Sequence, residues 1–210
     1  ADPRKMGGSL MRVFRDTRFT RDKTPYKTNI GIHFRHALGK DVHAPGFYVH
    51  IAVDECFLGA GCWHPEAAVL GRTRDLIATE PKRWFAARDH RTFRAVWSLA
   101  GDSLTRPPRG YAADHPAIDD LKRKDFIGLA PLAAEALGAP DLVNRVAGSF
   151  AAAAPLMTFL CRAAGVPVAI CPGVTAASAA AAGLGRSLTL RGLARKLVFV
   201  TAHARAGEPL

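Results

Sequence analysis

The residues best suited to chemistry lie in one stretch, residues 12–27, with the sequence RVFRDTRFTRDKTPYK. Guanidinium groups alternate there with carboxylates and aromatic rings, and Pro25 restricts the backbone so that a helix cannot run through. Residues 1–27 hold eight Lys or Arg side chains against three acids, an excess of five. Such a cluster can either bind phosphate and carboxylate groups or be neutralised by ion pairs within itself.

We predict a strand followed by a loop over this stretch, with an anion-binding surface on it. The second, internally paired arrangement is the alternative. A further stiff loop at residues 106–111, RPPRGY, adds a guanidinium group to the prediction. The predicted anion-binding residues are Arg15, Arg18, Lys23, Tyr26, Lys27 and Arg109.

Three segments after this stretch show the period-two alternation of strands. They cover residues 29–35, 47–54 and 57–63 and have short links, which predicts an antiparallel meander. Gly59 and Gly61 mark places in the third strand where another backbone or a ligand comes close. The apolar side should pack on helices, so a polar set then shares the opposite face and could do acid–base chemistry near neutral pH. That set is His33, Arg35, Tyr48 and His50; an ordinary solvated sheet face is the alternative.

The remaining pattern predicts helices around this sheet. We expect helices over 65–79, 80–88 and 116–124, the last with three cations in its final turn, and a strand over 93–99. From Asp141 an apolar stripe with steps of four and three predicts a buried helix, which Pro155 should break near Ala151. The predicted fold class is therefore α+β, an antiparallel sheet meander packed against helices.

Composition fits a globular protein with anionic partners. The 210 residues are 49% apolar and 22% charged, and the net charge of +11 favours nucleic acid or phosphorylated metabolites. The four cysteines have neither disulfide-framework nor zinc-finger spacing, so we expect buried thiols and no metal site. We find no signal-peptide core, and prolines and glycines interrupt the charge-free run 163–185. We expect a cytoplasmic protein without a membrane partner.

Several ordered motifs resemble a bacterial family, domain of unknown function 2461. They are RDTRFTRDKTPYK at 15–27, HAPGFY at 43–48, GAG at 59–61, RPPRGY at 106–111 and DLKRKDF at 120–126. The resemblance covers residue 1 to about 165 and implies a fold to expect, but no activity. Members of that family begin with a further N-terminal helical region, so we expect this chain to start inside the family's domain.

Residues from about 166 to 210 resemble an internal piece of uroporphyrinogen-III C-methyltransferase, an S-adenosylmethionine-dependent enzyme of sirohaem and cobalamin synthesis. The motifs are PGVTAAS at 172–178, LT at 188–189, RG at 191–192 and VFVTAH at 198–203. The resemblance implies a C-terminal α/β fragment in which Thr175 and Ala176 contact the cofactor. The family's glycine-rich loop and later Gly-Gly-Asp loop have no counterpart in this chain, so we expect this fragment to be inactive.

The sequence therefore predicts two pieces, 1–165 and 166–210. The first is an α+β domain with a basic surface for an anionic small molecule or a phosphate group, and the second is an incomplete methyltransferase segment. Two alternatives stay open, methyltransferase activity and non-specific nucleic-acid binding, and the predicted reaction and catalytic residues are unassigned.

Overall fold

A five-stranded antiparallel sheet forms the centre of the fold. The computed structural model describes residues 8–35 and 43–168, and this fold is that of the unit ending at Val168. Neighbouring strands follow the order β1-β2-β3-β5-β4, so the predicted three-strand meander is confirmed and is extended by two further strands. The strands are β1 Asn29–Arg35, β2 Gly46–Ala52, β3 Cys56–Cys62, β4 Ser98–Ala100 and β5 Phe126–Pro131.

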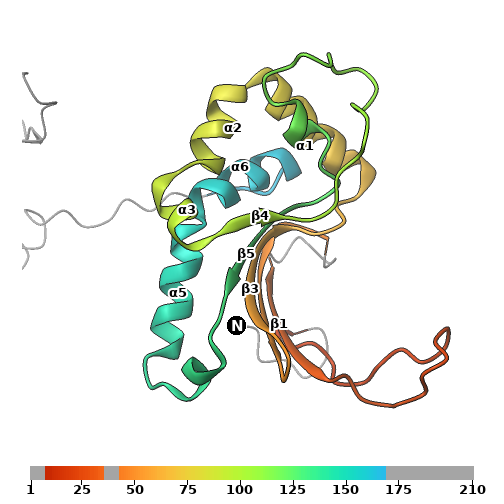
Figure 1. Cartoon of the computed structure of the whole chain (residues 1–210), viewed down its shortest axis with the longest axis vertical. Coiled ribbons are helices and arrows are strands. Elements are labelled where there is room, and N and C mark those ends of the chain that lie inside the picture. Colours follow the sequence, from red (N-terminus) through yellow and green to blue (C-terminus); the bar gives the residue numbers. More distant parts are fainter. Residues whose placement is uncertain (1–7, 36–42, 169–210) are drawn as a thin grey trace, which may run out of the picture. The chain divides into compact units, whose positions relative to one another are not determined.

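Helices cover one face of this sheet. Figure 1 shows α1, α2, α3, α5 and α6 on the same side of the curved sheet, which confirms the predicted α+β class. The helices are α1 Ala67–Thr79, α2 Pro81–Arg88, α3 Arg91–Val96, α4 Ile118–Leu121, α5 Leu142–Ala152 and α6 Ala154–Ala164, with a 3-10 turn at Ala134–Gly138.

The core lies between the helices and the apolar side of the strands. Trp84 of α2 is fully buried, and its ring packs against Phe126 of β5 at 5.7 Å and Phe159 of α6 at 5.1 Å between centroids. Val49 and Leu58 are buried on the same side of the sheet. Each such side chain contributes about 1.5–3 kcal/mol by leaving water. The helices are thus held to this face, and the other face of the sheet is left for the site.

The predicted break at Pro155 is confirmed. Helix α5 ends at Ala152, α6 begins at Ala154 with Pro155 in its first turn, and the two helices meet at a bend of 61°. Within the described residues no single helix is long and apolar enough to cross a membrane. The bent pair α5 and α6 passes that test only by length and composition, and α6 buries five of its residues in the core.

The predicted strand over residues 93–99 is wrong for most of its length. Residues 91–96 form α3, and β4 begins only at Ser98. The His90 ring accepts a hydrogen bond from the Thr92 backbone amide, which caps the helix start. Phe93 and Trp97 are four residues apart and stack with ring centroids 6.4 Å apart, a helical contact that the period-two interpretation overlooked.

Strand β5 was not predicted, and the helix expected over 116–124 is much shorter. Helix α4 spans four residues, and the chain then turns so that the Lys124 amide donates to the Asp102 carbonyl. Strand β5 pairs with both β3 and β4. Its residues carry the near-continuous apolar pattern of a central strand, which periodicity alone does not separate from a helix.

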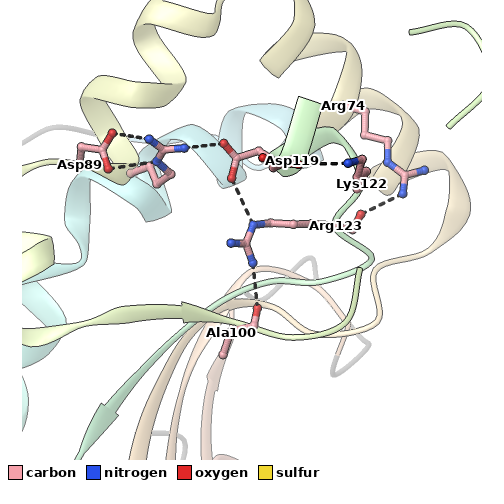
Figure 2. Close-up of polar contacts among 8 residues, drawn as sticks. Arg74, Asp89, Ala100, Asp119, Lys122 and Arg123 are labelled. Atoms are coloured by element: carbon pink, nitrogen blue, oxygen red, sulfur yellow. Dashed lines mark hydrogen bonds and ion pairs between the residues drawn. The ribbon is translucent and has the colours of Figure 1, made fainter. Parts of the chain in front are cut away.

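A buried carboxylate joins α4 to its neighbours (Figure 2). Asp120 is 4% exposed; it accepts hydrogen bonds from Arg88 of α2 at 2.6 Å and from Arg123 at 3.2 Å. Arg123 also contacts the Ala100 carbonyl, and its own carbonyl accepts from Arg74 of α1. Two of the three cations predicted for a helix end are therefore used in ion pairs, since Lys122 pairs with Asp119.

Replacing this carboxylate should cost far more stability than replacing its neighbour. We expect Asp120→Ala to lower the free energy of unfolding by about 3 kcal/mol, because it leaves the partly buried Arg123 without its anion and leaves Arg88 with Asp89 alone. The matched control is Asp119→Ala, whose carboxylate is exposed and should change stability by about 0.5 kcal/mol or less. Urea unfolding of both variants measures the difference. Equal losses of unfolding free energy would contradict the greater importance of the buried carboxylate.

Candidate functional site

A pocket of about 540 Å³ lies on the face of the sheet opposite the helices. Its lining is mostly apolar and comes from all five strands, from the segment that precedes β1, and from residues that follow β3 and β4. The strand registers explain this, because His33 of β1, Tyr48 of β2, Gly59 of β3 and Leu129 of β5 lie side by side in one row across the sheet. Met11, His50, Phe57, Trp63 and Ile127 complete most of the wall.

The polar groups of the pocket form a short row. The Tyr48 hydroxyl lies 3.1 Å from Nδ1 of His50, within hydrogen-bond distance. The His50 ring stacks on Phe57 with centroids 4.6 Å apart, and the His33 ring lies edge-on to Tyr48 at 6.4 Å. Nδ1 of His33 is buried and makes no hydrogen bond to any residue that the structure describes.

The surroundings of His33 and Tyr48 favour the neutral form of each side chain. Burial lowers the pKa of His33, and the nearby charge of Arg35 lowers it further. Burial also raises the pKa of the Tyr48 phenol. Both effects disfavour the charged form of the side chain in an apolar surrounding. His33 and Tyr48 thus offer the pocket hydrogen-bonding groups in their neutral forms.

Glycines let the rings of this row lie flat on the sheet. A Cβ atom at Gly31 would come within 2.7 Å of the Tyr48 hydroxyl oxygen, and a Cβ atom at Gly46 within 2.7 Å of Nε2 of His33. Both distances are shorter than any normal contact, so larger residues would push the rings into the cavity. Because Gly31 and Gly46 have no side chain, the Tyr48 and His33 rings can lie against the backbone of these two residues.

The basic stretch forms an arm beside the outer edge of β1 instead of a regular strand. Its backbone makes isolated bridges, Leu10 with Ile32 of β1 and Phe14 with Tyr26 across the arm. The Met11 amide donates to the Gly31 carbonyl, which places Met11 at the pocket. Figure 1 shows this arm, residues 8–28 in red, extending away from the helices.

Two of the predicted anion-binding arginines are paired within the arm. Arg18 makes hydrogen bonds to both carboxylate oxygens of Asp16, at 3.0 and 2.7 Å, and this contact lowers the pKa of Asp16 to about 2. Arg15 pairs with Asp22. Lys23 donates to the Thr17 carbonyl at 2.7 Å. The internally paired alternative therefore describes much of the charge alternation.

The other predicted anion-binding residues do not gather at one place. Tyr26 stacks on Phe14 with ring centroids 5.5 Å apart, and Lys27 forms no ion pair with a described residue. Arg109 is exposed in the segment between β4 and α4, which Figure 1 shows far from the arm. The predicted set thus divides between two separate segments.

The predicted sheet-face set largely meets in the pocket. His33, Tyr48 and His50 line it together. Arg35 lies at the end of β1, where it pairs in register with Gly46, and is not among the lining residues. Gly59 and Gly61 were predicted to mark a close approach of a backbone or a ligand. Both line the pocket, and Gly61 lies against the Phe126 backbone.

Sequence reasoning missed the parts of the wall that come from elsewhere in the chain. Met11 and Leu129 belong to segments whose position follows only from the pairing of the arm and of β5. Cys62, expected to be a buried thiol, is buried, and burial with the nearby Cys161 raises its pKa to about 12. The predicted cofactor contacts Thr175 and Ala176 lie outside the described residues.

Comparison with known proteins places the chain in a family. A family model described as "Conserved hypothetical protein (DUF2461)" matches residues 1–159. A search of curated proteins found no match, and neither did a search of solved structures. The match includes the arm, the whole sheet and every lining residue of the pocket. The chain therefore belongs to the DUF2461 family of conserved hypothetical proteins.

Proposed function

We propose that this protein binds a small, mainly apolar molecule with one uncharged hydrogen-bonding group in the sheet-face pocket. The observation that carries the proposal is a cavity of about 540 Å³ whose mostly apolar lining includes the polar side chains of His33, Tyr48 and His50. Small-molecule sites are typically concave, roughly 300–1,000 Å³ in volume, and apolar with a few placed polar groups. The pocket has each of these features.

The neutrality of the polar row favours an uncharged ligand group. A charged group would lose its hydration in the pocket without gaining an opposite charge from His33 or Tyr48, and that loss is costly. A hydroxyl, amide or carbonyl group could instead exchange hydrogen bonds with the phenol and the imidazoles. The apolar remainder of the ligand would contact Phe57, Ile127 and Leu129.

Filling the pocket from its floor should abolish binding. A Cβ atom at Gly59 would meet its nearest neighbour at 3.4 Å, so Gly59→Val fits the backbone while its methyl groups enter the cavity. We expect this variant to bind the neutral fluorescent probe N-phenyl-1-naphthylamine at least about tenfold more weakly, a loss of about 1.4 kcal/mol. Probe fluorescence titration measures it.

The matched control for this prediction is Gly71→Ala. Gly71 lies in α1 with no atom within 4 Å of an added Cβ, and the change should leave probe affinity unaltered. Circular dichroism of both variants verifies that they are folded. Unchanged probe affinity in folded Gly59→Val would contradict binding in this pocket.

Acid should weaken the fold through His33. Its pKa in the folded chain lies below the ordinary value of 6.5, so the unfolded chain takes up a proton first as the pH falls. The contribution of neutral His33 is therefore complete above about pH 6.5 and declines as the pH drops from there towards the folded-state pKa. We expect His33→Gln to lose less unfolding free energy than the parent between about pH 7.5 and about pH 5.5. Urea unfolding at both pH values tests this, and equal losses would show that His33 is not held neutral.

The arm supports a second candidate function, the anion binding predicted from the sequence. Arg12, Arg21 and Lys27 form no ion pair with a residue that the structure describes, so their charge is available to a phosphate or carboxylate group. The paired Arg15 and Arg18 would hold the arm in shape without contributing donors. Anion binding should then depend on the first group of cations and not on the second.

Two double variants of equal charge separate these groups. We expect Arg21→Ala/Lys27→Ala to weaken binding of inorganic tripolyphosphate about tenfold or more at low salt, because two charge-assisted contacts are lost. Arg15→Ala/Arg18→Ala removes the same charge from paired positions and should weaken it much less. Isothermal titration calorimetry measures both, and equal effects would mean that only net charge matters.

The methyltransferase-like stretch stays a prediction from sequence alone, as do S-adenosylmethionine as its cofactor, nucleic-acid binding and the cytoplasmic location. The functions proposed for the pocket and the arm do not depend on any of them.

A further inference from the structure

A histidine and a buried aspartate meet at one end of the pocket, where β3 ends and β5 begins. Nδ1 of His64 lies 2.9 Å from Oδ1 of Asp125. The carboxylate is 1% exposed, whereas the His64 side chain is about half exposed. Nε2 of His64 makes no hydrogen bond to a described residue. One edge of the imidazole is thus fixed by protein, and the other can meet water or a ligand.

Asp125 is held as a carboxylate by its surroundings. Burial raises its pKa, but hydrogen bonds from the backbone amides of His64 at 2.7 Å and Asp102 at 3.0 Å, and from the His64 ring, outweigh burial. The net effect keeps the pKa of Asp125 below its ordinary value. An ionised carboxylate facing Nδ1 holds the proton there, so the lone pair on Nε2 is free to accept another.

The pair lies next to two lining residues of the pocket, Trp63 and Gly101, although His64 and Asp125 do not line it themselves. His64 adopts a left-handed conformation with φ +46°, which turns both its amide and its ring towards Asp125. Its imidazole stacks on the indole of Trp63 with centroids 4.3 Å apart, and Trp63 lines the pocket. Gly101, the residue before Asp102, lines the same pocket. A strained backbone at such a place is a recognised feature of functional sites.

We propose that His64 acts as a general base on a water molecule at the pocket, that Asp125 is its positioning residue, and that the substrate is a carboxylic ester with an apolar acyl group. This inference rests on the function proposed for the pocket. His64 Nε2 accepts a proton from water while the water oxygen bonds to the ester carbonyl carbon. The imidazolium then returns that proton to the departing alkoxide as the ester C–O bond breaks, which yields an acid, an alcohol and neutral His64.

The apolar pocket and its neutral row favour this substrate over a charged one. An acyl chain can occupy the apolar wall of the pocket, with its ester group at the end of the pocket where Trp63 and His64 stack. A purely structural role for Asp125 needs only its two backbone hydrogen bonds. The imidazole would then be dispensable for any chemistry in the pocket, and this is what the experiment separates.

The test uses the full chain with p-nitrophenyl butyrate as the probe ester. We expect saturable hydrolysis whose rate rises with pH as a histidine loses its proton, and we expect His64→Gln to lower kcat/KM about a hundredfold and to remove that pH dependence. The matched control is His43→Gln. His43 also stacks on Trp63, but its Nδ1 faces the Trp63 carbonyl oxygen, and its loss should leave hydrolysis unchanged.

Two further measurements assign each outcome. Nitrogen NMR of the histidines should show His64 protonated on Nδ1 in the parent and a mixture of tautomers in Asp125→Asn. In the hydrolysis assay, Asp125→Asn should have a reduced kcat and little change in KM. Binding of N-phenyl-1-naphthylamine to His64→Gln reports on the pocket separately. No probe binding to the parent overturns the pocket function. Probe binding together with absent hydrolysis, or with hydrolysis that His64→Gln leaves intact, overturns the general-base inference alone.

Discussion

The structure depends on a sheet that is packed from one side only. Trp84, fully buried between Phe126 and Phe159, joins a helix, the strand β5 and a second helix in one contact. Because the apolar side of each strand is covered in this way, the alternate residues all face the opposite direction. The pocket residues lie in register on that face, where their rings contact one another. Their positions follow from the burial of their neighbours in sequence.

Two buried aspartates then fix the loops at the ends of the strands, and their partners differ. Asp120 faces two arginines, which need its charge and have no proton to exchange at neutral pH. Asp125 faces two backbone amides and an imidazole, so its charge bears on a ring that can carry its proton on either nitrogen. The two aspartates are similarly buried, but Asp120 holds arginines in place, whereas Asp125 orients the imidazole that we propose as a general base.

The part of the site that lies on consecutive strands could be predicted, and the rest could not. Alternation alone puts His33, Tyr48 and His50 on one face, because a register shift of one residue would turn the apolar side chains of a strand away from the core. The His64–Asp125 contact joins residues 61 positions apart and depends on β5, whose short apolar run does not distinguish strand from helix. The helix α3 was misjudged for a related reason, since Phe93, Val96 and Trp97 satisfy more than one period. Pro155, by contrast, acts through its own backbone, and its effect was predictable.

The charge of the chain and the chemistry of the pocket are separate properties. The net charge of +11 attracts anions to the molecule. Within the arm, Asp16 and Asp22 already pair with two of the arginines. Inside the pocket, burial keeps His33 and Tyr48 uncharged, so attraction at long range does not determine what fits there. An anionic molecule drawn to the arm would still lose its hydration on entering the pocket, with no cation among these residues to replace it. Specificity at this site must therefore come from shape and from the hydrogen bonds of a neutral row, whichever charge first brings a molecule to the surface.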